Sequence, residues 1–349
     1  MKVLQAPQHL CIPHLLEDWA ARTPDAPAIV ASGRAPLTYG RLRRHIDDVV
    51  QTLRAMGVER HDRVALILPN GPEMATAFLA VAAGATCAPL NPAYSADELA
   101  FYLADLRATA LIIQADMESP ARAIAQACGI AIIELLPALA AEAGLFTLTG
   151  AVQPHAVWHG YAQPHDVALI LHTAGTTSHP KRVPLTHTNL CTSAHNMRVA
   201  LGLSASDRCL NVLPLFHMHG IMGPVLVSLV AGASVVCTPG FAVPQFFAWM
   251  AELHPTWYTA VPTMHQAILA HAALHHDIIT RCPLRFIRSG SAALPPQVLA
   301  DLERVFHAPV IEIYGLTETS GHMTCHPVPG RKRKAGSVGV AAGPEVAIT

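Results

Sequence analysis

Residues 167–189 read VALILHTAGTTSHPKRVPLTHTN, and the interpretation of the whole chain starts from this stretch. Its first part, 167–172, is almost entirely apolar and predicts a strand that is buried on both faces. The next nine residues combine a glycine, small hydroxyl side chains and one lysine, and a helical pattern follows over 187–201. The sequence therefore predicts a strand, a polar loop and a helix in that order.

The polar loop contains the residue types that bind phosphate. Glycine and threonine allow backbone N–H and side-chain O–H groups to approach phosphate oxygens, and a lysine neutralises their charge. The candidate phosphate ligands are Thr173, Gly175, Thr176, Thr177 and Lys181. A Walker A loop is excluded, because Pro180 stands where that motif has a glycine directly before the lysine. Composition alone leaves two alternatives, a phosphate-binding loop and a polar surface loop.

The composition indicates a globular protein with two lobes. The 349 residues exceed the usual size of one domain, and 52% are apolar while 13% are charged. The net charge is -1 and no helix carries a basic stripe, which argues against a nucleic-acid-binding protein. The basic run at 331–334 fits a solvated loop, and we assign it no role.

The cysteine and histidine patterns exclude two classes of site. The eight cysteines are scattered without a CxxC pair, which indicates a reducing compartment and predicts a cytoplasmic location. The 21 histidines include no HExxH motif or Cys/His quartet, so we expect no structural zinc.

The N-terminus lacks the pattern of a secretory signal, and no apolar run is long enough to span a membrane.

Short apolar runs alternate with helical patterns along the chain, which predicts the α/β class with mainly parallel sheets covered by helices. We expect two α/β subdomains, 1–160 and 161–330, joined in the Pro- and Gly-containing segment 151–166, and the start of a further β structure at 331–349. The predicted strands are 63–68, 110–114, 131–134, 167–172, 209–213, 233–237, 257–261, 285–289 and 309–314. The predicted helices are 39–56, 72–83, 95–106, 187–201, 244–253, 262–278 and 295–306.

The string LHTAGTTSHPKRVPLTHTNL at 171–190 resembles the signature of the adenylate-forming superfamily, Thr-Ser-Gly-Thr-Thr-Gly-x-Pro-Lys-Gly. It departs from that pattern at Ala174, Ser178 and Arg182, which puts the shape of the phosphate contact in doubt. Further motifs follow in family order: PLFHMHG at 214–220, SGSAAL at 289–294 and YGLTET at 314–319. TWYTAVPT at 256–263 and RFIRSGSAAL at 285–294 are most similar to the oxalyl-CoA synthetase and peroxisomal-type acyl-CoA ligase branch.

The resemblance implies an ATP-dependent ligase that converts a carboxylic acid to an acyl-adenylate and then to a coenzyme A thioester. The implied catalytic residues are Lys181, His217, Thr317 and Glu318, with Glu318 as the ligand of Mg²⁺. The implied adenine site has two walls. Its residues are Gly290, Ser291 and Ala292 on one side and Glu312, Ile313, Tyr314, Gly315 and Thr317 on the other. His219 is an alternative to His217 as the histidine beside the substrate carboxylate.

Family members continue for more than a hundred residues past the point where this sequence stops. We therefore expect the large N-terminal domain of such an enzyme, truncated at the start of its β-barrel subdomain. Three functions stay open: an acyl-CoA synthetase, an acyl-AMP ligase that loads a carrier protein, and a non-catalytic nucleotide- or acyl-binding module. Oxalate is one candidate acid. A longer aliphatic or aromatic acid is another, because His322 stands one position later than the corresponding histidine of the oxalate-using relatives.

Overall fold

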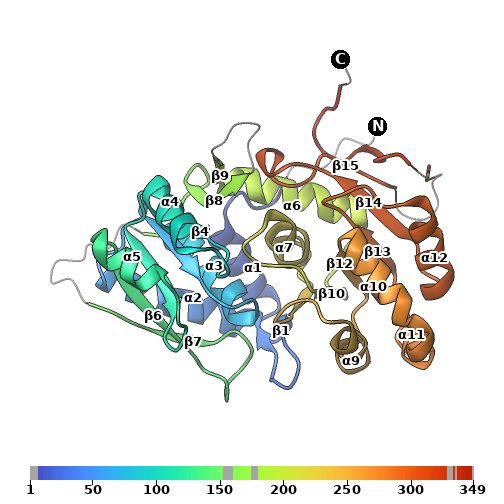
Figure 1. Cartoon of the computed structure of the whole chain (residues 1–349), viewed down its shortest axis with the longest axis horizontal. Coiled ribbons are helices and arrows are strands. Elements are labelled where there is room, and N and C mark those ends of the chain that lie inside the picture. The colour runs from blue at the N-terminus through green and yellow to red at the C-terminus, as the bar shows by residue number, and fades with distance from the viewer. Residues whose placement is uncertain (1–6, 152–159, 174–179, 328–332, 335, 348–349) are drawn as a thin grey trace. The chain divides into compact units, whose positions relative to one another are not determined.

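The computed structural model describes residues 7–151, 160–173, 180–327, 333–334 and 336–347, and the chain forms two compact units (Figure 1). Unit 1 consists of Met1–Gln8, Ala28–Gly33 and Leu190–Thr349, and unit 2 of His9–Pro27 and Arg34–Asn189. The division falls at residue 189, whereas the sequence-based division was at 160. The reason is that strand β8 (Val167–Thr173) pairs in parallel with β4 (Thr86–Pro89) of unit 2.

The sheet of unit 2 has the strand order β7-β6-β5-β3-β4-β8-β9. Its inner strands are parallel, while β7 and β9 run antiparallel to their neighbours β6 and β8. The bounds not yet given are β3 (Arg63–Ile67), β5 (Ala110–Gln114), β6 (Ala131–Pro137), β7 (Phe146–Thr149) and β9 (Lys181–Thr186).

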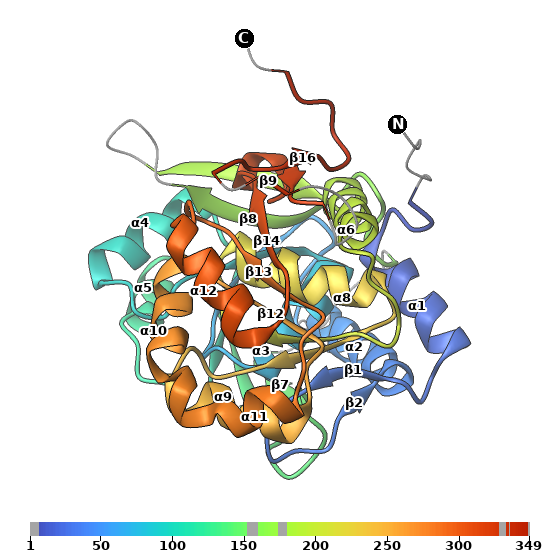
Figure 2. The same cartoon turned by 90° about the vertical axis from the view of Figure 1, so that its right-hand side faces the viewer.

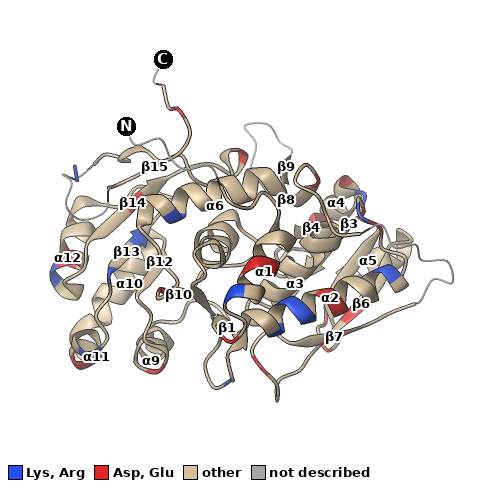
Figure 3. Cartoon of the chain, turned by 180° about the vertical axis from the view of Figure 1, so that it is seen from behind, with Lys and Arg blue, Asp and Glu red and all other residues tan. Residues whose placement is uncertain are grey.

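Helices cover this sheet, and their ends follow from local sequence. They are α1 (Ile12–Arg22), α2 (Tyr39–Ala55), α3 (Pro72–Gly84), α4 (Ala96–Leu106) and α5 (Ala121–Ala127), and the short strand β2 (Leu37–Thr38) precedes α2. Ser95 and Glu98 form a capping box at the start of α4. The apolar side chains of α4 and α5 pack on those of β3 and β5. The outer face of α2 carries charges of both signs (Figure 3), including the ion pair of Arg43 with Asp47 at 2.6 Å.

The sheet of unit 1 is parallel from β14 to β1, in the order β14-β13-β12-β10-β11-β1, and β15 and β16 continue it antiparallel beyond β14. Its strands are β1 (Pro27–Val30), β10 (Arg208–Asn211), β11 (Ser234–Cys237), β12 (Trp257–Ala260), β13 (Phe286–Ser289), β14 (Val310–Tyr314), β15 (Thr324–Cys325) and β16 (Val340–Ala341).

The helices of unit 1 follow these strands in the chain. They are α6 (His187–Leu201, which begins in unit 2), α7 (Met218–Gly220), the π-helix η1 (Ile221–Leu226), α8 (Val227–Val230), α9 (Val243–Leu253), α10 (Pro262–Ala272), η2 (Ala273–His275), α11 (His276–Arg281), α12 (Pro296–Phe306) and η3 (Thr317–Thr319). Helices α9, α10, α11 and α12 lie together along the sheet (Figure 2) and close an apolar core built from Phe246, Tyr258 and Ile287.

The predicted class is confirmed: the chain is α/β with two mainly parallel sheets. The predicted helix 187–201 is confirmed as α6, but the strand before it was not predicted. Lys181–Thr186 form β9 and pair antiparallel with β8. The physical reason is the alternation at Val183 and Leu185, which are buried while their neighbours are exposed or intermediate. The predicted helix 262–278 is also divided, into α10, η2 and α11.

A buried carboxylate fixes the amino ends of three neighbouring strands of unit 1. Asp207, which is 2% exposed, precedes β10 and accepts hydrogen bonds from Thr256 Oγ1 at 2.8 Å and from the Ser204 N–H at 2.9 Å. It also forms an ion pair with Arg285, which precedes β13. Burial alone would raise the pKa of Asp207, but Arg285, the Ser204 N–H and Thr256 together lower it below its ordinary value.

Replacing Arg285 with alanine is expected to destabilise the chain by about 2 kcal/mol at neutral pH, because it leaves the buried Asp207 carboxylate without its cation. Since the folded-state pKa of Asp207 is the lowered one, this contribution is complete above the unfolded pKa of about 3.9 and is lost as the pH falls through the folded value. Denaturant unfolding at pH 7 and below pH 4 measures the difference. An Arg285→Ala penalty that is unchanged at low pH would contradict this account.

Candidate functional site

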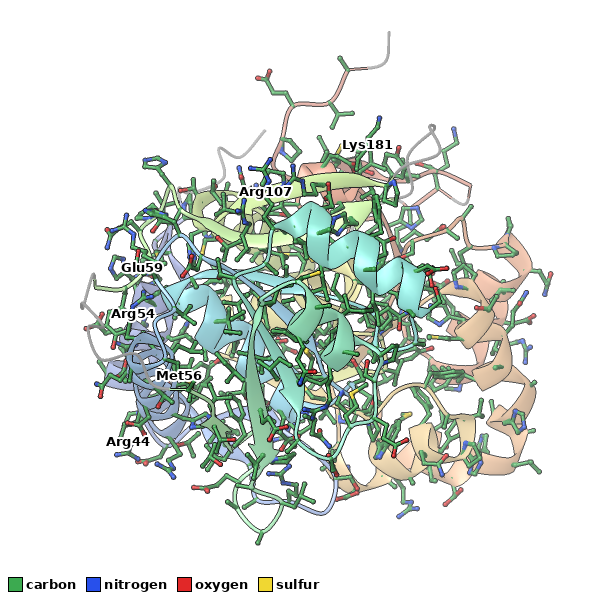
Figure 4. All side chains as sticks on the ribbon, turned by 60° about the vertical axis from the view of Figure 1, so that its left-hand side comes forward. Arg44, Arg54, Met56, Glu59, Arg107 and Lys181 are labelled. Carbon is green, nitrogen blue, oxygen red and sulfur yellow. The ribbon has the colours of Figure 1, made fainter. Side chains whose placement is uncertain are left out.

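The β8–β9 hairpin of unit 2 carries the first group of predicted site residues. Thr173 ends β8 and Lys181 begins β9, and the two are opposite one another in the antiparallel register. The Lys181 side chain is exposed (Figure 4). Gly175, Thr176 and Thr177 lie outside the described residues. The hairpin therefore presents a cation and a threonine at the two ends of the predicted phosphate loop.

An ion-pair network holds the base of this hairpin to α4. The His172 Nε2 atom lies 3.0 Å from Asp105 Oδ2, and Arg182 Nε lies 3.2 Å from the same oxygen. Arg182 also donates to the Asp105 carbonyl oxygen at 2.7 Å. Burial lowers the pKa of His172, while Asp105 opposes that shift. Arg182, one of the departures from the family pattern, thus has a structural partner within unit 2.

The second group of predicted residues lies on unit 1, where β13 and β14 end side by side. Their parallel register places Ser289 opposite Glu312, so the segments that follow the two strands emerge at the same edge of the sheet. One segment is Gly290, Ser291 and Ala292. The other consists of the last two residues of β14, Ile313 and Tyr314, and of Gly315, Thr317 and Glu318 after the strand.

Close packing requires glycine in both segments. A Cβ at Gly290 would lie 2.9 Å from Ile313 Cγ1 and 3.1 Å from His219 Cε1. A Cβ at Gly315 would lie 2.5 Å from the carbonyl group of Gly321. Contacts this short force the neighbouring atoms to shift. Gly290 therefore allows the Ile313 and His219 side chains to pack against it, and Gly315 allows the backbone at Gly321 to come close.

The polar side chains of this edge are at least partly exposed to solvent. Tyr314 is 44% exposed and Glu318 is exposed within the one-turn helix η3, while Thr317 is half-buried. Glu312 has a structural role, because its Oε1 atom accepts the Leu294 N–H at 3.2 Å and so holds the loop after β13. The turn containing Glu318 is tied to α6 by Ser193, whose Oγ donates to the Ser320 carbonyl oxygen at 2.9 Å.

The two histidines of the 214–220 segment differ in their surroundings. His217 is exposed and caps the short helix α7, its Nδ1 accepting the His219 N–H at 3.2 Å. His219 is buried, with Nδ1 2.8 Å from Ser291 Oγ and Nε2 2.8 Å from Thr259 Oγ1. Burial lowers its pKa well below the ordinary value, so the ring is neutral. The alternative candidate, His219, is thus the one that connects the 214–220 segment to the loop after β13.

Two buried polar residues of unit 1 extend the set named from the sequence: Arg288 was not identified there, and His322 was noted only for its shifted position. Arg288 on β13 is 1% exposed and donates from Nη1 to Thr259 Oγ1 at 2.9 Å. His322, three residues after η3, is 3% exposed. The sequence does contain a signal for Arg288: a charged residue lies within an apolar strand, FIRS, all of whose residues are buried. Charged residues rarely occupy such positions unless they are paired.

The described residues contain no group of three or more His, Cys, Asp or Glu side chains placed to hold a metal ion. A single exposed carboxylate such as Glu318 fits a different kind of ion, one that keeps water ligands and is shared with substrate phosphates. The donor set thus fits Mg²⁺ held together with a nucleotide. Among the described helices, none is both long and apolar enough to cross a membrane.

Comparison with known proteins gives consistent matches over nearly the whole chain. The family described as AMP-binding enzyme matches residues 16–349. The chain is 41% identical over 344 residues to the oxalate–CoA ligase of Arabidopsis thaliana, covering 96% of this chain and 66% of the relative. It is 32% identical over 329 residues to the sulfoacetate–CoA ligase of Cupriavidus necator, covering 93% and 63%.

Solved structures agree with the sequence relatives. The ATP-bound MatB of Rhodopseudomonas palustris superposes with a TM-score of 0.80 at 28% identity, covering 95% of this chain and 64% of that one. The chain therefore spans slightly less than two thirds of the length of the proteins that it resembles.

Replacing Gly315 with alanine is expected to destabilise the chain by about 2 kcal/mol, because the new methyl group would press on the Gly321 backbone. Thermal unfolding measures the effect. Gly150→Ala is the matched control, since a Cβ there would meet its nearest neighbour, the Ile132 carbonyl oxygen, at an ordinary 3.4 Å. Equal melting temperatures of the two variants would contradict the close approach at Gly315.

Proposed function

The chain belongs to the AMP-binding enzyme family, and we propose from this membership that it is the nucleotide- and acid-binding part of an ATP-dependent ligase. The family prediction made from the 171–190 string is confirmed. The reaction is the conversion of a carboxylic acid to an acyl-adenylate and then to a coenzyme A thioester. One observation carries the proposal: the parallel pairing of β13 with β14, which brings the two segments after these strands to one edge.

These two segments form the adenine site in the proposal. Tyr314, whose ring is 44% exposed, offers an aromatic face on which adenine stacks. Gly315 permits close approach of the backbone on that side. Gly290, Ser291 and Ala292 form the opposite wall, where small side chains leave room for the ring. Glu312 supports this wall through its hydrogen bond to the Leu294 N–H.

The hairpin of unit 2 binds the phosphates in the proposal. The Lys181 ammonium neutralises phosphate charge, and Thr173, together with Gly175, Thr176 and Thr177 of the loop, donates hydrogen bonds to the oxygens. The exposure of Lys181 and its position opposite Thr173 support this role. Lys181 is not committed to an ion pair with a described carboxylate.

Thr317 and Glu318 act at the α-phosphate in the proposal. A bound Mg²⁺ would offset the negative charge of the triphosphate as the carboxylate approaches. Glu318 holds this ion through its carboxylate, and Thr317 donates to an α-phosphate oxygen. The exposure of Glu318 in the turn η3, which Ser193 anchors to α6, supports this arrangement.

The chemistry has two steps. A carboxylate oxygen of the acid attacks the α-phosphorus, a new P–O bond forms, and the bond to pyrophosphate breaks. The sulfur of coenzyme A, after its thiol has lost its proton, then attacks the acyl carbon, a C–S bond forms, and AMP leaves with the electrons of the acyl C–O bond. His217 and His219 stand at the acid end of the site in the proposal. His219, neutral and hydrogen-bonded to Ser291 and Thr259, acts as a fixed positioning residue rather than as a cation.

The names of the relatives suggest the substrate class. Oxalate and sulfoacetate are short acids that carry a second anionic group beside the reacting carboxylate. We therefore favour a short acid of this kind over a long aliphatic or aromatic acid. The names also favour free coenzyme A over a carrier-protein thiol. The eight cysteines are all free thiols, which fits the proposed cytoplasmic location.

Calorimetric titration of the chain with ATP tests the proposal. Lys181→Ala is expected to weaken ATP binding about 10-fold or more, through loss of a charge-assisted contact to phosphate. Arg44→Ala is the matched control. Arg44 is an exposed cation of unit 2 that lies well away from Lys181 (Figure 4), and its removal should leave binding unchanged.

The metal role has its own measurement. Glu318→Ala is expected to weaken binding of ATP in the presence of Mg²⁺ and to leave binding of ATP in its absence unchanged, because only the carboxylate–metal contact is removed. If ATP binds the unchanged chain in neither condition, the ligase proposal is wrong. If Glu318→Ala weakens both conditions equally, Glu318 is not the metal ligand.

A further inference from the structure

Arg288 is a buried cation with no anionic partner among the residues that the structure describes. The residue is 1% exposed, and two of its five N–H groups donate to described acceptors, Thr259 Oγ1 at 2.9 Å and Met197 Sδ at 3.5 Å. Both acceptors are uncharged, and the sulfur is a weak one. The Nε atom is buried and has no hydrogen-bond partner among the described residues. Arg288 thus holds unused donors and an unbalanced positive charge inside unit 1.

This arrangement is unfavourable for stability alone. Burying a guanidinium costs several kcal/mol unless an anion and hydrogen bonds compensate it. Burial lowers the pKa of Arg288 to about 10, so the side chain still carries its charge at neutral pH. Cys209 and Cys325 are its titratable neighbours, and burial raises the pKa of both thiols, so they remain uncharged. The described part of unit 1 therefore provides no counterion for Arg288.

The surrounding chain makes room for this guanidinium. A Cβ at Gly223 would lie 2.4 Å from Arg288 Nη1, so a larger residue at 223 would displace the guanidinium from its observed position. Gly223 lies in η1, a π-helix, and π-turns in proteins occur frequently at functional sites. A glycine in an irregular helix and a buried arginine thus fit each other.

Other buried side chains of unit 1 also have polar atoms without a described hydrogen-bond partner, and His322 and Ser289 are among them. Both ring nitrogens of His322 and the hydroxyl of Ser289, the neighbour of Arg288 on β13, have no described partner. His322 is 3% exposed, and Ser289 is 1% exposed. Burial lowers the pKa of His322 to about 3, and the charge of Arg288 adds to the shift. His322 is therefore a neutral ring that can donate one hydrogen bond and accept another.

Hydrogen bonds connect Arg288 to the proposed acid site. Thr259 Oγ1 accepts from Arg288 Nη1, and the Thr259 hydroxyl proton is then available for Nε2 of His219. When Nε2 of His219 accepts a hydrogen bond from this hydroxyl, the ring carries its own hydrogen on Nδ1. Nδ1–H then donates to Ser291 Oγ, in the loop after β13. A chain of hydrogen bonds through Thr259 and His219 thus connects Arg288 to Ser291, which belongs to one wall of the proposed adenine site.

We infer that Arg288, with His322 beside it, binds the second anionic group of the acid substrate and so selects short diacids over monoacids. The inference rests on the proposed ligase function and adds to it a residue that determines substrate specificity. The second carboxylate or sulfonate supplies the missing counterion and accepts from the unused donors of Arg288. A monocarboxylic acid leaves the guanidinium unpaired, and its binding gains nothing from it.

Two non-reactive mimics of the acyl-adenylate test the inference by calorimetry: an adenosine sulfamate bearing an oxalyl group and its acetyl counterpart. The oxalyl mimic is expected to bind about 100-fold more tightly, the effect of pairing a buried charge. Arg288→Met is expected to abolish this preference while binding of the acetyl mimic changes little. Arg288→Lys, which keeps the charge, should restore part of it.

Stability of the free chain separates this role from a structural one. Because methionine replaces an unpaired buried cation with an apolar side chain of similar length, Arg288→Met is expected to melt at the same temperature as the unchanged chain or above it. His322→Leu is the second variant. It should keep the fold and reduce the oxalyl preference about 10-fold, through loss of a hydrogen bond to a charged group.

Arg304→Met is the matched control, since Arg304 is an exposed cation of unit 1 paired with Asp301 on the surface of α12, and it should leave the preference unchanged. Equal affinity of the unchanged chain for both mimics overturns the inference and leaves the ligase proposal standing. An equal loss of both mimics in Arg288→Met also overturns it, because that result assigns Arg288 a structural role. If neither mimic binds the unchanged chain, the inference and the proposed function both fail.

Discussion

The parallel register of β12, β13 and β14 is the constraint on which the rest of unit 1 depends. Parallel strands point their carboxyl ends to one edge, so residues that follow different strands meet there. At the opposite edge, Asp207 binds Thr256 before β12 and Arg285 before β13. A single buried carboxylate thereby sets the relative position of two strands at their amino ends. That position fixes where the loops at their carboxyl ends emerge.

The regular elements could be predicted because each depends mainly on its own sequence. The apolar run of β5 (Ala110–Gln114) matches its predicted bounds, and Ser95 with Glu98 marked the start of α4 within one residue. Strand β9 was missed because its inward pattern is limited to Val183 and Leu185, and a proline, which is unfavourable in most strand positions, stands between them. The π-helix η1 could not be predicted from local sequence, and its close packing at Gly223 against the Arg288 side chain joins residues distant in the chain.

The candidate site likewise contains residues that local sequence identifies and contacts that it does not. Residues at strand ends, such as Ser291 and Tyr314, belong to short continuous motifs and could be named from the sequence. The contact of His219 with Ser291 joins residues 72 positions apart, and no local pattern specifies it. The sequence alone does not distinguish His217 from His219 as candidates. The fold shows that the His217 ring is exposed, while the His219 ring is buried between two hydroxyl groups.

The buried histidines and the buried arginine of unit 1 differ in whether they can lose their charge at physiological pH. Burial lowers the pKa of His265 to about 4, so this ring is neutral at physiological pH, and its Nδ1 atom lies 3.1 Å from the Tyr258 hydroxyl. A histidine therefore enters the core by releasing its proton, at a modest cost in free energy. Arg288 cannot do so, since even its lowered pKa lies far above neutrality. A histidine-rich core thus needs no functional explanation, whereas one unpaired guanidinium beside a proposed acid site does.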